Sequence, residues 1–243
     1  METVLIAGGT GHLGRNIEKE LTLKGYKVLI LTRKPSKENH IFWNPSENKI
    51  DTEKLSEVEI IINLAGENIG EKKWSNERIK ALFLSRINPA IVLYENRTSF
   101  PRLKQYISAS GINCYGYDSL TKIYEENDVY GTDTLSQIVE KWEEAADLFL
   151  DKYIVTKMRT AVVLDAKDGA FQKIAQPIKM GIGSPLGSGE QYISWVHIDD
   201  LVASYVFAIE NKIEGTYNIV GGNDSNKTFG KTLAKKLKKG FWF

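Results

Sequence analysis

Apolar residues along the chain form short continuous runs, separated by longer segments in which they recur every three or four positions. The runs predict strands at residues 3–7, 27–32, 59–64, 105–110, 154–163 and 216–220. The helical periodicity predicts helices at residues 12–24, 76–96, 134–150 and 199–210. Several strands, such as the one within EIIINLA, are apolar at nearly every position, which is typical of parallel strands covered by helices on both faces. The pattern therefore predicts an α/β fold with a doubly wound parallel sheet of the Rossmann type.

The predicted organisation is a Rossmann domain at residues 1–165 and a small C-terminal substrate lobe at residues 166–243. A chain of 243 residues can bury a full core of this kind. Because the sequence contains no repeat, low-complexity segment or linker, we expect the lobe to interleave with the first domain and to contribute a strand and a helix to its core. The loop-rich stretch 181–198 should lie beyond the carboxyl ends of the strands and form the substrate cleft.

Composition and charge exclude several classes of partner. Lys and Arg number 32 against 31 Asp and Glu, a net charge of +1, so no electrostatic footprint for nucleic acid or an anionic membrane is visible. The KKLKK run at 235–239 is expected to be a solvated helix face. One cysteine, Cys114, excludes an internal disulfide framework. With no signal peptide and no apolar run long enough to span a membrane, the sequence predicts a soluble cytoplasmic protein, and it leaves the oligomeric state open.

The most informative motif is TVLIAGGTGHLG at residues 3–14, in which a strand breaks into glycines before a helix. Gly8 would form a tight turn, Gly11 would offer bare backbone to a pyrophosphate, and Gly14 would allow close contact between helix and sheet. The helix beginning near His12 would direct its first amides and its dipole at the phosphates. A second strand, KVLILT, follows, so the context that this motif requires is present. The motif predicts a dinucleotide site, with a glycine turn that only packs as the alternative.

The end of the second strand predicts which dinucleotide is bound. An NAD site usually has an acidic residue about 20 residues after the glycine turn, where it holds the ribose 2′-hydroxyl. This chain has Thr32, Arg33 and Lys34 there instead. A guanidinium could hold a 2′-phosphate by charge-assisted hydrogen bonds, so the sequence favours NADP(H). The alternative is that Arg33 and Lys34 only begin a solvated loop.

Blocks that span nearly the whole chain resemble a known family. GGTGHLG, NLAG at 63–66 and SASGINCYG at 108–116 resemble an extended short-chain dehydrogenase/reductase. NLAGENIGEKKWSNERIKALFLSR, KWEEAA, MRTAVVL and GSPLGSGEQYISWVHIDDLV resemble its atypical SDR39U1-like (YfcH-like) branch of nucleoside-diphosphate-sugar epimerases. Members of that branch continue for several tens of residues beyond the position of Phe243, so the resemblance implies that the last helical lobe is truncated.

The resemblance also implies a cofactor site. Its residues would be Gly8, Thr10, Gly11, His12, Leu13 and Gly14 at the pyrophosphate; Thr32 and Arg33 at the adenosine ribose phosphate; Leu64 and Ala65 along the adenine and ribose; and Val163 on the nicotinamide side. Arg86 is a candidate second cation for the cofactor, with an ordinary helix-surface arginine as the alternative.

The catalytic dyad of short-chain dehydrogenases has no match in the expected helix. In those enzymes a tyrosine and a lysine four residues later share one helix face, and a serine orients the substrate oxygen. Ser110 matches the serine, but Leu135 and Val139 stand where the dyad belongs. The spacing recurs from Tyr153 to Lys157, in a segment that reads as a strand, where four residues separate side chains by about 13 Å.

Tyr115 is the remaining candidate acid, with packing or substrate stacking as its alternative role. At the substrate end, His197 and Asp199 match the loop with which extended members hold a nucleotide-sugar, but Ile193 replaces a diphosphate-binding arginine. His197 could instead brace the next helix, and Asp199 could be its N-cap.

Two classes of function remain. The first is an NADP-dependent oxidoreductase or epimerase acting on a small carbonyl substrate or a nucleotide-sugar, with Ser110 orienting the oxygen. The second is a non-catalytic relative that binds NADP(H) as a sensor or regulatory ligand. The glycine motif supports both; the missing dyad favours the second, and Ser110 with the cleft loop favours the first.

Overall fold

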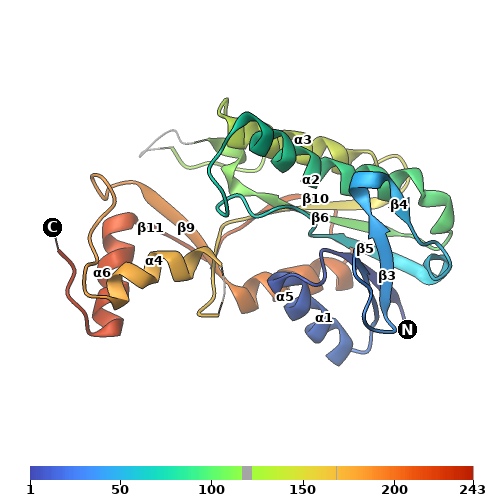
Figure 1. The fold of residues 1–243 in the computed structure, drawn as a ribbon, viewed down its shortest axis with the longest axis horizontal. Coiled ribbons are helices and arrows are strands. Elements are labelled where there is room, and N and C mark those ends of the chain that lie inside the picture. Colours follow the sequence, from blue (N-terminus) through green and yellow to red (C-terminus); the bar gives the residue numbers. More distant parts are fainter. Residues whose placement is uncertain (117–121, 168, 243) are drawn as a thin grey trace.

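The computed structural model describes residues 1–116, 122–167 and 169–242, and its centre is an eight-stranded sheet (Figure 1). The strand order is β10 (Gly215–Ile219), β7 (Ile154–Thr160), β6 (Gln105–Gly111), β5 (Val58–Asn63), β1 (Thr3–Ala7), β2 (Lys27–Thr32), β3 (His40–Asn44) and β4 (Lys49–Ile50). Neighbouring strands are parallel except for the antiparallel pair of β3 and β4. The carboxyl ends of the parallel strands therefore share one edge, where a ligand site of this fold is expected.

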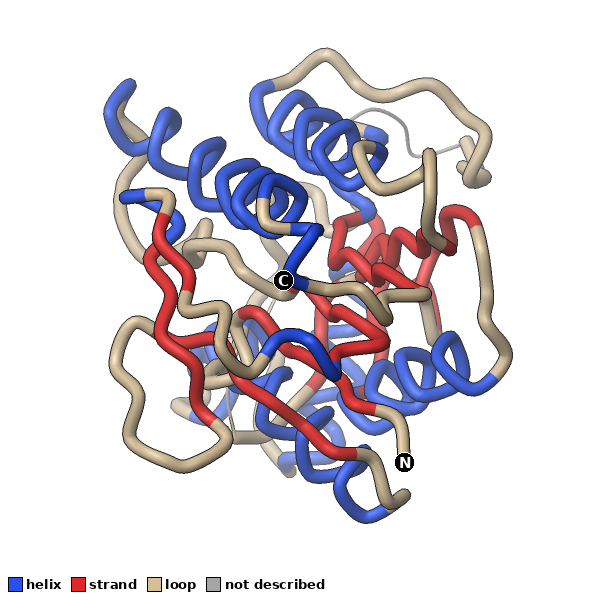
Figure 2. Tube along the Cα trace, turned by 90° about the vertical axis from the view of Figure 1, so that its right-hand side faces the viewer, coloured by secondary structure: helices blue, strands red, loops and turns tan. Residues whose placement is uncertain are grey.

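Helices cover both faces of this sheet, as the tube in Figure 2 shows. Helices α1 (His12–Leu23) and α5 (Ile198–Glu210) pack on one face, and α2 (Asn76–Glu95) and α3 (Thr134–Asp147) pack on the other. In β1, Val4 and Ile6 belong to the first core, whereas Leu5 and Ala7 belong to the second. This alternation explains why the strand is buried at every position and apolar from Val4 to Ala7, and it confirms the predicted doubly wound α/β fold.

A smaller layer lies beside the main sheet (Figure 1). It is a three-stranded sheet in the order β11 (Gly222–Ser225), β9 (Tyr192–His197) and β8 (Val162–Leu164). Strand β9 runs parallel to β8 and antiparallel to β11. Helices α4 (Ala170–Lys179) and α6 (Asn226–Leu237) pack against each other on this lobe. After β9 the chain returns to the main layers as α5 and β10.

The structure corrects the sequence prediction at two places. The single strand predicted at 154–163 is wrong, because the chain leaves β7 after Thr160 and β8 joins the small sheet. Ala161 lies at this break and donates its N–H to the carbonyl of Ile219, 3.2 Å away. The stretch 181–198 is also not all loop, since β9 occupies its last third. Elements of the small lobe are short and partly exposed, so their apolar pattern is weak.

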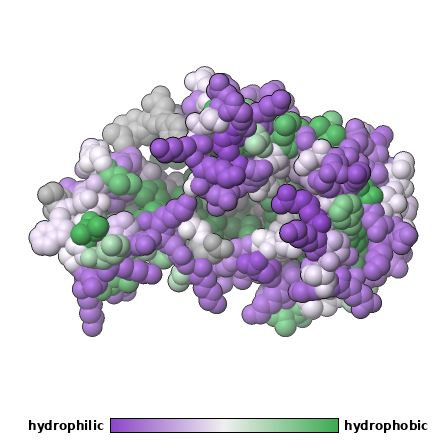
Figure 3. All heavy atoms as spheres, viewed as in Figure 1, coloured by the Kyte–Doolittle hydropathy of each residue, from purple (hydrophilic) through white to green (hydrophobic). Residues whose placement is uncertain are grey.

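Among the described residues, no helix combines the length and the apolarity that a membrane crossing requires. On the face shown in Figure 3, hydrophilic residues dominate and apolar residues form small separate groups.

Candidate functional site

The glycine turn joins β1 to α1 at the carboxyl edge of the sheet. Gly8 has a φ of 79°, and the N–H of Gly11 donates to the Gly8 carbonyl at 3.0 Å. A Cβ atom on Gly8 would lie 2.9 Å from the carbonyl carbon of Leu64, and one on Gly14 would lie 2.5 Å from the Cα of Gly9. Both distances are shorter than real Cβ contacts, so these positions require glycine for the turn to approach β5 and α1.

Helix α1 begins without a side chain that caps it. Its N-cap residue is Gly11, whereas Ser75 caps α2 and Asp133 caps α3 with their side-chain oxygens. The first-turn amides of a helix need acceptors from outside the helix, and the helix dipole favours an anion there. Leu13 packs its side chain against the core, so only its backbone belongs to the turn. This end of α1 is suited to hold a phosphate group.

A groove of about 1090 Å³ runs along the carboxyl ends of β1, β2 and β5. Thr32 is nearly buried at its wall, and its Oγ1 accepts a hydrogen bond from the N–H of Lys34 at 3.2 Å. The side chains of Arg33 and Lys34 are exposed. Among the residues predicted for the cofactor, the groove brings together Gly8, Thr10, Gly11, Thr32, Arg33, Leu64 and Ala65. The volume is large enough for a dinucleotide-sized ligand.

Part of the groove wall comes from residues that the sequence pattern did not assign to the site. These are the end of β3 with the 3-10 turn after it, and one face of α2: Trp43, Pro45, Ser46, Ala81, Leu84, Ser85, Asn88 and Pro89. A signal for β3 exists in the sequence, because buried Ile41 and Trp43 alternate with exposed Phe42. This is the period of a strand, although the run is short.

Arg86 is not a surface residue, so that alternative is wrong. It is 9% exposed, and its guanidinium donates to the carbonyls of Glu67 at 3.0 Å and Leu82 at 3.2 Å. The guanidinium carbon lies 5.1 Å from the ring centre of Trp142. Burial, together with the nearby charge of Arg78, lowers the pKa of Arg86 to about 10. Arg86 lies behind the groove wall, and its role toward a cofactor stays a prediction.

The other predicted cofactor residues do not form part of the groove lining. His12 and Gly14 lie in the first turn of α1, directly after the lining residue Gly11. Val163 lies in the small sheet, opposite Val196 of β9, and its side chain packs against the core. A contact of Val163 with the nicotinamide end stays a prediction.

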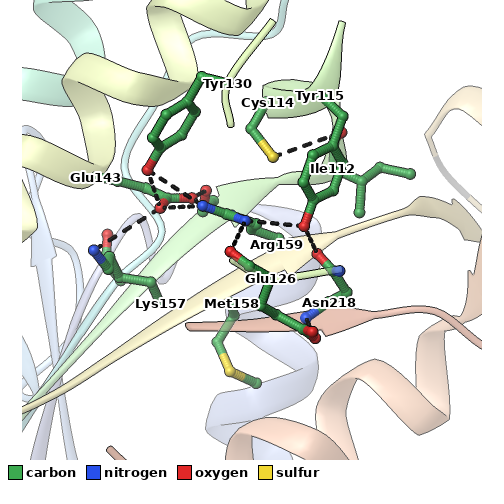
Figure 4. Close-up of polar contacts among 12 residues, drawn as sticks. Ile112, Cys114, Tyr115, Glu126, Tyr130, Glu143, Lys157, Met158, Arg159 and Asn218 are labelled. Atoms are coloured by element: carbon green, nitrogen blue, oxygen red, sulfur yellow. Dashed lines mark hydrogen bonds and ion pairs between the residues drawn. The ribbon is translucent and has the colours of Figure 1, made fainter. Parts of the chain in front are cut away.

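Ser110 and Tyr115, the two catalytic candidates, belong to one buried polar network. Its centre is the ion pair of Glu143 and Arg159, which Figure 4 shows. The hydroxyl of Ser110 on β6 donates to Glu143 Oε1 on α3 at 2.5 Å. Arg159 on β7 donates from Nε to Oε1 at 2.8 Å and from Nη2 to Oε2 at 3.0 Å. Ser110, Glu143 and Arg159 are 4%, 2% and 3% exposed. The parallel register pairs Ser110 with Arg159, which is why one carboxylate on the helix above can reach both.

The phenol of Tyr115 forms the other side of this network (Figure 4). Arg159 Nη1 donates to its oxygen at 2.9 Å, and the phenol donates to Asn218 Oδ1 on β10 at 2.7 Å. Tyr130 donates to Glu143 Oε2 at 2.8 Å. The network thus joins α3, three neighbouring strands of the main sheet and the segment before α3.

Burial and the ion pair set the charge states in the network. Burial raises the pKa of Glu143, but hydrogen bonds from Arg159 and Ser110 outweigh it, so the net pKa lies below its ordinary value. Burial also raises the pKa of Tyr115, and the hydrogen bond from Arg159 reverses only part of this effect. Glu143 is therefore ionised at neutral pH, and Tyr115 is a protonated phenol that makes a poor base.

The expected positions of the catalytic dyad are apolar and buried. Leu135 and Val139 lie on α3, and Val139 packs against Tyr115. The other candidate spacing is confirmed to lie along a strand segment: Tyr153 precedes β7, and Lys157 within β7 pairs with Asp147 at 2.8 Å. No lysine amine is brought to the phenol of Tyr115 in the part of the chain that the structure describes.

His197 is the N-cap residue of α5, which confirms that it braces this helix. Its ring accepts a hydrogen bond from the N–H of Asp199 at 3.2 Å. Asp199 lies in the first turn of α5 and is not the cap. The sequence placed the start of this helix correctly, but only the structure decided that His197 and not Asp199 is the N-cap residue.

Known proteins resemble this chain over most of its length. Residues 4–220 match the model of the NAD dependent epimerase/dehydratase family. The human epimerase family protein SDR39U1 is 32% identical over 240 residues, which cover 96% of this chain and 80% of that protein. An epimerase family protein of Mycobacterium leprae is 31% identical over 223 residues, covering 90% of this chain and 71% of the relative.

Solved structures agree with this relationship. The crystal structure of human SDR39U1 (isoform 2) with NADPH has a TM-score of 0.88 at 32% identity, and the match covers 98% of this chain and 80% of that one. The nucleoside-diphosphate sugar epimerase from Corynebacterium glutamicum has a TM-score of 0.85 at 30% identity, covering 97% of this chain and 51% of that one. With its Rossmann-like NAD(P)-binding fold and a family match from Val4 to Val220, the chain belongs to the NAD dependent epimerase/dehydratase family.

Proposed function

We propose that this chain binds NADP(H) in the groove at the carboxyl edge of the main sheet. The observation that carries the proposal is that one groove is lined by the glycine turn at Gly8 and Gly11 and by Thr32 and Arg33 at the end of β2. The site fits the nucleotide because the turn offers bare backbone, the helix start has no side-chain cap, and a guanidinium stands where NAD sites have a carboxylate. The bound NADPH of human SDR39U1 supports the same ligand.

In this proposal each segment of the site has its own task. The backbone from Gly8 to Gly14, with Thr10, His12 and Leu13, holds the diphosphate. Thr32 and Arg33 bind the 2′-phosphate. Leu64 and Ala65 line the adenine and ribose, Val163 approaches the nicotinamide side, and Arg86 adds a positive charge behind the wall. When bound, NADP(H) supplies a hydride donor or acceptor. The single buried cysteine fits a reducing compartment, and a cytoplasmic location belongs to the same proposal.

Isothermal titration with NADPH and NADH tests the cofactor assignment. A hydrogen bond to a charged group contributes about 1.5–3 kcal/mol, so NADPH should bind at least about tenfold more tightly than NADH. Arg33→Ala should remove most of this preference while leaving NADH affinity nearly unchanged. Arg102→Ala, an exposed arginine outside the groove, is the matched control. Equal affinities for both nucleotides, or an unchanged preference in Arg33→Ala, would contradict the proposal.

A catalytic role toward a small carbonyl substrate or a nucleotide-sugar is the second candidate, with sensing of NADP(H) as its alternative. The observation that favours catalysis is the guanidinium of Arg159, 2.9 Å from the phenol oxygen of Tyr115. A cation at this distance favours the phenolate, which is the electrostatic task of the lysine in the usual dyad. The nucleotide-sugar is suggested by the name of the Corynebacterium glutamicum relative. Against catalysis stand the raised pKa of Tyr115 and the engagement of Ser110 by Glu143.

Turnover measurements separate the two roles. NADPH oxidation and sugar epimerisation are followed for the wild type, Ser110→Ala and Tyr115→Phe. General acid–base assistance typically contributes about 10²–10⁴ in rate, and its loss predicts slow or absent turnover even at saturating NADPH. Robust turnover that either substitution abolishes would establish catalysis by these residues and refute the sensor. Robust turnover that survives both would show that the chemistry belongs to other residues.

A further inference from the structure

The side chain of His12 is paired with a carboxylate beside the glycine turn. His12 Nε2 is in hydrogen-bond contact with Asp165 Oδ2, and the two side chains are 22% and 10% exposed. His12 is the first residue of α1, whereas Asp165 follows β8 at the start of the small lobe. Thr10 and Gly11, directly before His12, line the groove. The pair therefore connects the small lobe to the turn that, in the proposed function, holds the diphosphate.

Asp165 is held by a second contact as well. Its Oδ1 accepts a hydrogen bond from the backbone N–H of Lys167 at 2.7 Å. Burial raises the pKa of Asp165, but the hydrogen bonds from Lys167 and His12 outweigh it, so the net pKa lies below its ordinary value. The carboxylate of Asp165 is thus held near the N-terminus of α1, and the same helix end would attract a diphosphate.

Two anions at one helix start repel each other unless a cation lies between them. An imidazole titrates near neutral pH, and in its protonated form both ring nitrogens are donors. We propose that Asp165 is a positioning residue of the cofactor site: it holds the His12 imidazolium beside the diphosphate, so that NADP(H) binding takes up a proton. This inference rests on the proposed function.

Other charged side chains lie on the elements next to the pair. On α1, Arg15 donates to the Thr10 carbonyl at 2.5 Å, and on the loop after β8 Lys167 lies near Asp165. At the start of the neighbouring α5 stands a further imidazole, that of His197, whose Nδ1 lies 3.6 Å from Asp199 Oδ2. The 2′-phosphate of the cofactor also titrates, near pH 6.

The test is the pH dependence of NADPH affinity, measured by isothermal titration from pH 6 to pH 8 in two buffers of different ionisation enthalpy. Between pH 6 and pH 8 the NADPH affinity of the wild type should fall about tenfold more than that of His12→Asn. The reason is that uptake of one proton on binding changes the affinity by up to about tenfold per pH unit. The 2′-phosphate contributes equally to both proteins and cancels in this comparison. The buffer dependence should report proton uptake on binding.

Two further variants distinguish positioning from simple bracing. Asp165→Asn keeps an oxygen for the Lys167 N–H but loses the charge, so its profile should flatten toward that of His12→Asn. His197→Asn should keep the wild-type profile. If Asp165→Asn lowers thermal stability, or lowers affinity by one factor at every pH, while the slope stays that of the wild type, the pair is only a brace and the inference is overturned.

The failure of this inference is distinguishable from failure of the proposed function. A wild-type profile no steeper than that of His12→Asn, with the preference for NADPH over NADH intact, overturns the proton linkage alone. If wild-type protein binds neither nucleotide at any pH, the proposed function falls and this inference falls with it.

Discussion

Glu143→Gln should destabilise the protein strongly, because it leaves the charge of Arg159 buried without a carboxylate. The side chains of Arg159 and Glu143 are 4% and 2% exposed. Their hydrogen bonds are 2.8 and 3.0 Å long. An amide can still accept a hydrogen bond from Ser110 or Tyr130, but it cannot neutralise the guanidinium. Desolvation of an uncompensated charge is therefore the main cost of this substitution.

The expected loss is large relative to the stability of a domain. Removal of one partner from a buried ion pair costs about 3–5 kcal/mol, whereas domains have a free energy of unfolding of about 5–15 kcal/mol. Removal of both charges should lower the free energy of unfolding by less than the sum of the two single substitutions. For the double variant Glu143→Met with Arg159→Met, we expect a coupling free energy of about 2 kcal/mol.

Urea unfolding followed by far-ultraviolet circular dichroism measures these free energies. Glu144→Gln is the matched control on the same helix, since Glu144 pairs with Lys141 at 2.7 Å and both side chains are about half exposed, at 53% and 51%. That control should leave the unfolding midpoint nearly unchanged, because exposed pairs contribute little. If Glu143→Gln shifts the midpoint no more than the control, or if the two methionine substitutions are additive, Arg159 is not left as an uncompensated buried charge.

Three more results are expected. The pKa of Glu143 is lowered in the folded state, so its ionised form stabilises the fold fully above the unfolded pKa of about 4.3, and this stabilisation is lost as the pH falls through the folded pKa. Between pH 7 and pH 3 the urea midpoint should therefore fall more steeply in the wild type than in Glu143→Gln. Burial raises the pKa of the Cys114 thiol to about 12, so a disulfide reagent at pH 8 should react only after unfolding; rapid native reaction would contradict this burial. Gly14→Ala should abolish NADPH binding in titration, since its Cβ would lie 2.5 Å from the Cα of Gly9, whereas Gly70→Ala, with its nearest neighbour at 3.5 Å, should bind normally.

The sequence alone determined six of the eight strands of the central sheet and the four helices that cover it, because these elements have a clear apolar pattern. β1 is apolar from Val4 to Ala7 since both of its faces are covered, and α1 shows its core face through Ile17 and Leu21. The glycine turn could also be predicted, because its geometry is a property of a few consecutive residues. The position of Arg33 could be predicted too, because this residue comes directly after the predicted second strand.

The tertiary structure decided which distant side chains meet. Ser110 reaches Glu143 because β6 and β7 pair in one register beneath α3, and no local pattern carries that register. The groove wall at Trp43 depends on β3, which is too short to give a clear period. His12 and Asp165 are separated by 153 residues and meet only because β8 leaves the main sheet beside α1. Local sequence sets backbone periodicity and turns, whereas pairs of polar residues between distant segments depend on packing and strand register, which only the folded chain defines.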